Sequence, residues 1–343
     1  MNLQWRPYYG WSQPGAEEIP PLKRNALFVG ILMLALVAAA MVLPTLLLTL
    51  LDMLGIADMR LAYYGMGKTG YLFFQTAAYL LYLAVPSIVV ALIMRRDLHP
   101  FPSRRVRAGV LIPSVMTALG LVVLANLVAN LLMNILASFG LPMPSSSDTM
   151  DKTVLNLVLN LISSAVLPAL VEEMVFRGYI LGALRPQGDG IAIVFSAVLF
   201  GLLHGNLLQI PFAFILGLIF GYLTVQTGSI WPAVLIHFLN NAFSIALEYA
   251  AQFQTEAVAA RFSLNGAGFT VLAVIGVIGA GLLWTGHRRG DTGSQAVLRP
   301  IGNGFSALSV SRRVGLILLS PAVLISLIGL VFITLTNIAA DLL

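Results

Sequence analysis

The sequence contains no cysteine, and charged residues make up only 10% of it. Without cysteine the chain has no disulfides, iron–sulfur clusters, thiolate nucleophiles or cysteine-ligated zinc. A typical soluble domain is about 25% charged and about 45–50% apolar, whereas hydrophobic residues make up 59% of these 343 residues. A soluble fold cannot bury that much apolar surface, so the composition predicts an integral membrane protein and excludes a disordered chain or a nucleic-acid-binding protein.

Nine long apolar stretches follow one another along the chain, at residues 26–51, 71–94, 109–137, 153–184, 191–207, 210–227, 230–250, 267–285 and 314–338. Most reach the roughly 20 residues that a helix needs to cross a bilayer. The fifth and sixth are short and are joined only by Leu208 and Gln209, which fits either two steep spans or a broken hairpin. We therefore expect an all-α fold, a polytopic transmembrane helical bundle with about nine spans.

Lysine and arginine gather on the cytoplasmic side of membrane proteins. When the N-terminus is placed inside, most of the 19 basic residues fall on the inner side, and four fall outside, namely Arg60, Lys68, Lys152 and Arg261. The pattern predicts nine spans with the N-terminus inside and the C-terminus outside.

Composition divides the chain into four parts. Residues 1–25 are rich in aromatic residues and proline, and we expect a cytoplasmic tail there, followed by N-terminal transmembrane helices over 26–152. Residues 153–250 hold the ionisable residues described next. Residues 251–343 are expected to form C-terminal helices, with a cytoplasmic loop rich in Gly, Ser and Arg at 286–313.

The ionisable side chains inside the apolar stretches form a small set: Glu172, Glu173, Arg177, His204 and His237. An ionisable group in a bilayer is costly and is by default a functional hypothesis. Glu173 and Arg177 are four residues apart on one helical face, so we expect a buried ion pair with a supporting role. Glu172 points about 100° away from Glu173 and lacks a partner in its own helix, which suits a general base or a proton carrier.

Helical rise predicts that these residues meet. A rise of about 1.5 Å per residue places Glu172 and His204 roughly 20 Å from the inner ends of their helices. His237 and Asn241 share one face of their helix at about 10 and 16 Å. We expect the four side chains to converge from three helices at one depth.

Three short motifs, in this order and on hydrophobic helices, resemble those of the CPBP family: Glu172-Glu173-x-x-x-Arg177, Phe200-x-x-x-His204 and His237-x-x-x-Asn241. That family contains intramembrane type II CAAX prenyl endopeptidases and bacteriocin-processing or self-immunity proteins, also called the Abi family. The resemblance covers about residues 153–250 and implies that this part is the catalytic core.

The resemblance implies an intramembrane endopeptidase of a bacterial plasma membrane. Its partners would be membrane lipid and a membrane-associated protein or peptide substrate, prenylated or CAAX-like. By the same resemblance, Glu172 and His204 activate a water, His237 and Asn241 stabilise the oxyanion, and Glu173 and Arg177 support them.

Two mechanisms are open at this point. Amide hydrolysis needs a base for water and donors for the tetrahedral oxyanion, which the four side chains provide. In the alternative, a metalloprotease, Glu172, His204 and His237 hold one zinc ion with an open fourth position. We favour the version without a tightly bound metal, because Asn241 suits an oxyanion and is a poor zinc ligand.

Two other functions compete with proteolysis. One is a non-catalytic membrane scaffold or bacteriocin self-immunity protein that keeps the fold. The other is a proton-coupled transporter in which Glu172 and the histidines form a relay. The sequence shows no inverted repeat or paired broken helices, which disfavours the transporter.

Overall fold

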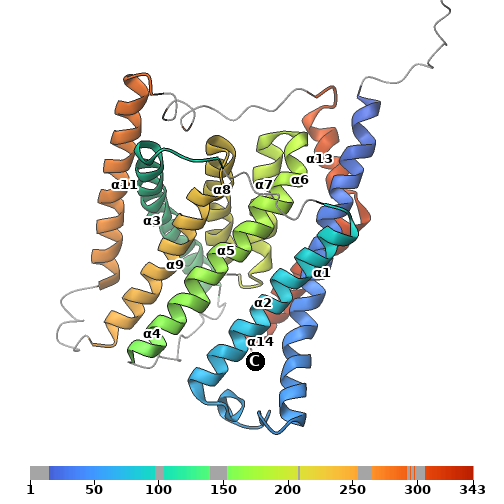
Figure 1. Cartoon of the computed structure of the whole chain (residues 1–343), viewed down its shortest axis with the longest axis vertical. Helices are drawn as coiled ribbons and strands as arrows, with labels where there is room; N and C mark the ends of the chain where they lie inside the picture. Colours follow the sequence, from blue (N-terminus) through green and yellow to red (C-terminus); the bar gives the residue numbers. More distant parts are fainter. Residues whose placement is uncertain are drawn as a thin grey trace, which may run out of the picture.

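The computed structural model describes residues 15–96, 104–139, 153–207, 209–253, 264–291, 294, 297 and 306–342. Every regular element within these ranges is helical, and they contain no strand. By length and composition, eight described helices can cross a membrane, and the shorter apolar helix Asp189–Leu203 accompanies them. The protein is an integral membrane protein with a polytopic helical bundle, as the composition predicts (Figure 1).

The helices in chain order are α1 (Ile19–Met53), α2 (Gly67–Ile93), α3 (Ala108–Ser138), α4 (Val154–Leu161), α5 (Leu167–Glu173), α6 (Leu181–Leu184), α7 (Asp189–Leu203), α8 (Gln209–Thr227), α9 (Trp231–Ala251), α11 (Leu264–Arg288), α13 (Val310–Leu318) and α14 (Pro321–Leu342). Within residues 153–207, the π-helical segments η3 (Ile162–Val166) and η4 (Met174–Ile180) join α4, α5 and α6 into one long helix. The predicted fourth span is this composite helix.

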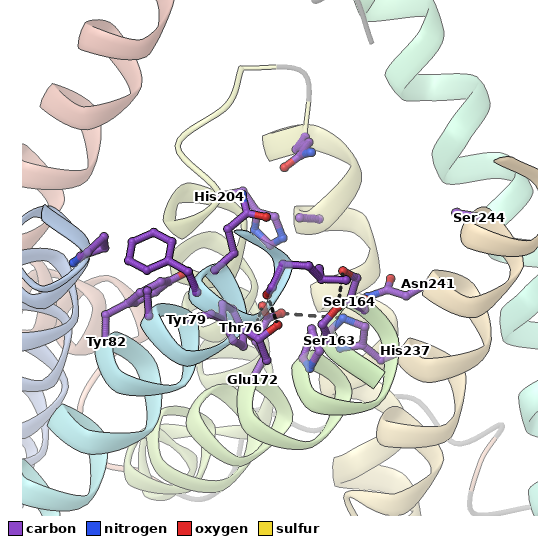
Figure 2. Close-up of a pocket in the computed structure, with 18 of the residues that line it drawn as sticks. Thr76, Tyr79, Tyr82, Ser163, Ser164, Glu172, His204, His237, Asn241 and Ser244 are labelled. Atoms are coloured by element: carbon purple, nitrogen blue, oxygen red, sulfur yellow. Dashed lines mark hydrogen bonds and ion pairs between the residues drawn. The ribbon is translucent and has the colours of Figure 1, made fainter. Parts of the chain in front are cut away.

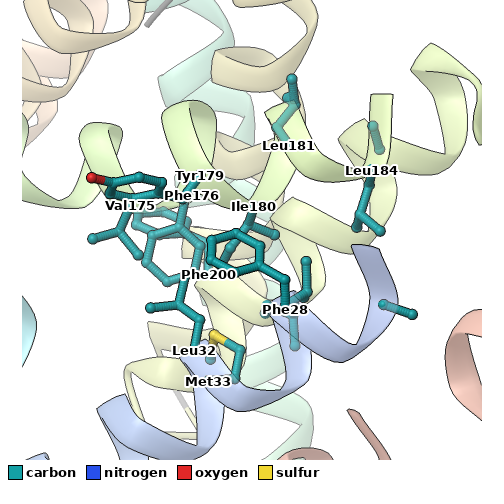
Figure 3. Close-up of a cluster of buried hydrophobic side chains, with 14 of the residues drawn as sticks. Phe28, Leu32, Met33, Val175, Phe176, Tyr179, Ile180, Leu181, Leu184 and Phe200 are labelled. Atoms are coloured by element: carbon teal, nitrogen blue, oxygen red, sulfur yellow. The ribbon is translucent and has the colours of Figure 1, made fainter. Parts of the chain in front are cut away.

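The composite helix runs through the middle of the bundle, with α1, α2 and α14 on one side and α3, α8, α9 and α11 on the other (Figure 1). A buried apolar cluster holds it against α1, where Phe28 and Leu32 lie close to Phe176 and Ile180 (Figure 3). Lipid tails are as apolar as these side chains, so the contact is stabilised mainly by close van der Waals packing. On the other side, α7 and α8 approach closely at Gly217, where an added Cβ would lie 2.8 Å from the Cα of Ala197.

Two helix boundaries differ from the sequence prediction. α1 begins at Ile19, inside the predicted tail, because prolines are tolerated in a first helical turn, where their missing N–H has no helical partner. The predicted last span, 314–338, is divided between α13 and α14, and the break falls just before Pro321. Proline cannot donate the hydrogen bond that would continue α13. Residues 1–14 and most of 286–313 lie outside the described residues.

The fifth and sixth apolar stretches of the sequence, 191–207 and 210–227, form α7 and α8, which are joined by a turn inside the bundle. α7 has 15 residues, which gives a length of about 22 Å against a hydrocarbon core of about 30 Å. The chain turns at His204 and Gly205, where glycine takes a positive φ of 60°. The side-chain amide of Asn337 in α14 donates to the Gly205 carbonyl at 2.8 Å. Non-helical backbone at membrane depth is tolerated where protein or a cavity surrounds it.

Eight described helices are long and apolar enough to cross a membrane, one fewer than the nine predicted, because α7 is shorter than the others. The start of α1, the end of α11 and helix α13 lie at the same end of the bundle, and the C-terminus lies toward the opposite end (Figure 1). That this end faces the cytoplasm remains a prediction from the lysine and arginine pattern.

Candidate active site

The acidic pair is carried by α5, the short segment between the two π-helical segments. A π-helical turn disturbs the regular hydrogen-bond ladder and is frequent at functional sites. Pro168 adds to this, because it has no N–H for the carbonyl four residues earlier, that of Ser164. The side-chain amide of Asn241 donates to the Ser164 carbonyl at 3.0 Å. Asn241 on α9 is therefore anchored to the composite helix.

The predicted ion pair between Glu173 and Arg177 is confirmed. Nη1 of Arg177 donates to Oε1 of Glu173 at 3.0 Å, and both side chains are 0% exposed. Nη2 of Arg177 donates to the carbonyl of Gly217 at 3.3 Å. The guanidinium also lies over the rings of Phe200 and Phe220, 4.5 and 5.1 Å from their centroids. The cation is thus held by the carboxylate, a carbonyl and two aromatic faces, which offsets its loss of water.

His237 continues this chain of contacts. Its Nδ1 lies 3.0 Å from Oε1 of Glu173, and its ring stacks on Phe220 at a centroid distance of 5.4 Å. A carboxylate paired with arginine only accepts hydrogen bonds, so the hydrogen of this bond is on Nδ1. Nε2 of His237 therefore faces Oε2 of Glu172, at 3.7 Å. This distance is too long for a hydrogen bond, so the two atoms face each other without one.

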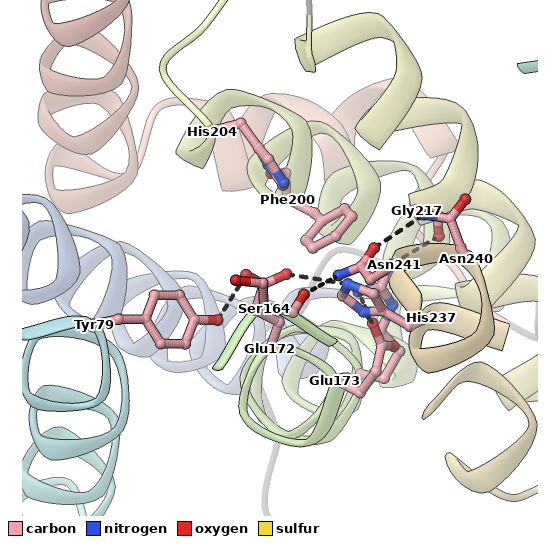
Figure 4. Close-up of polar contacts among 11 residues, drawn as sticks. Tyr79, Ser164, Glu172, Glu173, Phe200, His204, Gly217, His237, Asn240 and Asn241 are labelled. Atoms are coloured by element: carbon pink, nitrogen blue, oxygen red, sulfur yellow. Dashed lines mark hydrogen bonds and ion pairs between the residues drawn. The ribbon is translucent and has the colours of Figure 1, made fainter. Parts of the chain in front are cut away.

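Glu172 has a partner that the sequence prediction missed. Tyr79 of α2 donates its hydroxyl hydrogen to Oε1 of Glu172 at 2.7 Å (Figure 4). Oε2 of Glu172 is buried, and no described residue forms a hydrogen bond with it. Among the described residues, Glu172 has no partner in its own helix, as expected. Its partner is instead Tyr79 of α2. The sequence feature that could have indicated this partner is the pair of tyrosines, Tyr79 and Tyr82, inside the second apolar stretch.

His204 lies just after the end of α7, and Nδ1 is 2.9 Å from the carbonyl of Phe200. A carbonyl only accepts, so Nδ1 carries the hydrogen and Nε2 is left with a lone pair in the neutral ring. No hydrogen bond or ion pair joins His204 to Glu172 in the described part of the chain. The side chain instead shares a cavity with Glu172.

Asn241 is oriented by its neighbour. The side-chain amide of Asn240, which is buried, donates to Oδ1 of Asn241 at 3.0 Å. With its oxygen bound to Asn240 and one amide hydrogen on the Ser164 carbonyl, Asn241 keeps a second amide hydrogen for another acceptor. Asn240 and Ser164 were not predicted as site residues. Asn240 directly precedes Asn241 in α9, and Ser164 lies in the composite helix that carries Glu172.

The four predicted catalytic side chains line one cavity of about 730 Å³ between α1, α2, the composite helix, α7, α8 and α9 (Figure 2). The wall is aromatic on the α2 side and carries neutral polar groups on the side of α9 and η3. Its ionisable groups, apart from tyrosine, are Glu172, His204 and His237, and no lysine or arginine is among the described lining residues. The predicted convergence from three helices is therefore present, with α2 added as a fourth.

The zinc alternative needs Glu172, His204 and His237 to lie together around one ion. Among the described residues, no group of three or more His, Asp or Glu side chains lies close enough to hold a metal ion. The side chains of Glu172, His204 and His237 thus do not fit a three-ligand zinc site in this arrangement.

Comparison with known proteins addresses the same part of the chain. Residues 154–243, from α4 into α9, match the family model described as type II CAAX prenyl endopeptidase Rce1-like. This segment is Rce1-like. The resemblance to CPBP proteases that the three motifs suggested is thereby confirmed, and all six predicted site residues lie within the Rce1-like segment.

A curated relative points the same way. The protein named "Putative membrane peptidase YdiL" of Bacillus subtilis (strain 168) is 29% identical over 85 residues. The match covers 24% of this chain and 35% of the relative, so the two are alike over about a third of the relative's length. No solved structure matches the chain. The family model matches residues 154–243, and α1, α2, α3, α11 and α14 lie outside that range.

Proposed function

We propose that the protein is an intramembrane endopeptidase that hydrolyses a peptide bond of a membrane-associated protein or peptide. The observation that carries the proposal is the chain of contacts from Arg177 through Glu173 and His237 to Glu172, which ends at the wall of an intramembrane cavity. A carboxylate bound to Nδ1 of a histidine stabilises the protonated imidazole and fixes its orientation, as in other hydrolytic sites.

In this mechanism the carboxylate form of Glu172 acts as the base, and the imidazolium form of His237 acts as a hydrogen-bond donor. Glu172 accepts a proton from a water in the cavity, while the lone pair on Nε2 of His204 accepts a hydrogen bond from the water's other hydrogen, which stays on the oxygen. The resulting hydroxide oxygen attacks the carbonyl carbon of the peptide bond, and the electron pair of the double bond moves to the carbonyl oxygen.

The oxyanion needs donors aimed into the cavity. Nε2–H of His237 and the second amide hydrogen of Asn241 meet this requirement, because the remaining polar atoms of both side chains are engaged with Glu173, Ser164 and Asn240. The proton taken up by Glu172 passes to the leaving nitrogen as the C–N bond breaks. A dry setting strengthens each of these interactions.

The substrate class follows from the setting. The cavity lies among membrane helices, so a substrate must bring its peptide bond to membrane depth, and a lipidated C-terminal segment of the CAAX type does so. The family description of the Rce1-like segment supports such a substrate.

The test is peptide cleavage by the purified full chain in lipid nanodiscs, with a farnesylated CAAX-type peptide that carries a fluorophore and a quencher. Cleavage by wild type and none by Glu172→Gln supports the proposal. Comparative proteomics of membranes from cells with wild type or Glu172→Ala extends the test to natural substrates, through new C-termini of membrane-anchored proteins. If neither peptide cleavage nor new C-termini are found, a scaffold or immunity protein is favoured. Substrate-coupled proton flux in proteoliposomes would favour a transporter.

A further inference from the structure

Tyr79 connects the Rce1-like segment to a helix outside it. The residue lies in α2, 93 positions before Glu172, and its hydroxyl donates to Oε1 of the carboxylate at 2.7 Å. Short bonds of this kind to a charged acceptor are among the stronger hydrogen bonds in proteins. The same cavity contains both side chains (Figure 2).

This contact distinguishes the two oxygens of Glu172. Oε1 is occupied by Tyr79, whereas Oε2 is the atom that faces Nε2 of His237 at 3.7 Å. Oε2 has no hydrogen bond to any described residue. A carboxylate without an anchor turns about its last carbon–carbon bond, so it presents either oxygen to its surroundings. The hydroxyl of Tyr79 removes that freedom.

The Tyr79 ring is itself held in place. It packs edge-to-face against Tyr82, one turn later in α2, with centroids 5.4 Å apart and planes at 81°. A second polar contact, from the hydroxyl of Thr69 to Oδ1 of Asn156 at 3.1 Å, also ties α2 to the composite helix. α2 otherwise packs mainly on α1. The hydroxyl of Tyr79 is therefore placed by contacts that do not depend on Glu172.

We propose that Tyr79 is a positioning residue that holds the Glu172 carboxylate in one orientation, with Oε2 toward His237, for its role as the base. The proposal rests on the role proposed above for Glu172 as the base. It extends the site beyond the Rce1-like segment to α2.

The test compares Tyr79→Phe with Tyr222→Phe in the full chain in nanodiscs, on the same farnesylated fluorogenic peptide. Both variants keep the ring and lose one hydroxyl. Tyr222 is a matched control because its hydroxyl also makes a short hydrogen bond, 2.6 Å to the carbonyl of Val297, away from the catalytic cavity. Tyr79→Phe should lower kcat by roughly 10–100-fold, the factor expected for one hydrogen bond to a charged group, and leave KM within about twofold. Tyr222→Phe should leave both constants within about twofold of wild type.

A measurement that needs no turnover separates this proposal from the proposed function. The infrared band of the Glu172 carboxyl group is identified by its loss in Glu172→Gln. That band should shift in Tyr79→Phe and stay in place in Tyr222→Phe. Wild type without peptidase activity would count against the proposed function, and the infrared comparison would still decide whether Tyr79 binds this carboxylate. An unshifted band, an unchanged kcat, or an effect on KM alone in Tyr79→Phe would overturn the positioning role.

Discussion

One oxygen of Glu173, Oε1, lies 3.0 Å from Nδ1 of His237 and also 3.0 Å from Nη1 of Arg177. The second glutamate of the motif is therefore the link between a buried cation and the histidine of another helix. Its neighbour Glu172 points into the cavity and contacts α2 instead. Two adjacent carboxylates thus have separate surroundings, one in the buried ion-pair network and one at the cavity wall.

Glu172→Gln should abolish turnover and leave the folded yield unchanged. The amide keeps the shape of the side chain and an acceptor for Tyr79 but cannot take a proton from water. General base catalysis contributes about 10²–10⁴-fold, and a loss of that size is expected in kcat. Peptide cleavage together with monodisperse yield in detergent checks both parts. Retained activity at normal yield would remove Glu172 from the proposed role.

Glu173→Gln should act first on stability. It leaves Arg177 buried without its counter-charge, which typically costs about 3–5 kcal/mol. Thermal unfolding of the purified protein measures the effect, with Glu248→Gln as control, because Glu248 is an exposed carboxylate on α9. A Glu173→Gln protein as stable as that control would show that the ion pair is dispensable for folding.

Chelator treatment should leave activity intact, and elemental analysis should find well below one metal per chain. The reason is that Glu172, His204 and His237 are not gathered as a three-ligand set in the described residues. His237→Ala and Asn241→Ala should lower turnover without a change in metal content. Stoichiometric zinc that is lost together with activity in Glu172→Ala, His204→Ala and His237→Ala would establish the metal mechanism and leave the protease function in place.

Membrane orientation can be tested with single cysteines, because the chain has none of its own. A cysteine at Arg104 or Arg312 should be protected from an impermeant thiol reagent in intact cells, and one at Arg60 should be labelled. These positions lie on opposite sides in the predicted topology and are exposed in the structure. Labelling from outside at position 104 would reverse the N-terminus-inside prediction.

The membrane-spanning character, the all-helical fold and the small set of ionisable residues within the apolar helices could be predicted from the sequence. Long apolar stretches specify helices in a bilayer because every backbone polar group must be satisfied within the segment. Glu173 and Arg177 could be paired from spacing alone, since residues four apart on a helix are neighbours in any tertiary arrangement. The Rce1-like motifs are likewise short patterns on single helices.

The partners of Glu172, His237 and Asn241 were decided by tertiary structure. Tyr79 reaches Glu172, Glu173 reaches His237, and Asn241 reaches the Ser164 carbonyl, in each case from one helix to another. Sequence spacing fixes the angle of a side chain around its own helix, but not which helix that side chain faces. In a bilayer that choice depends on close packing of apolar surfaces and on the few polar groups between them, so it is settled only when all the helices are assembled.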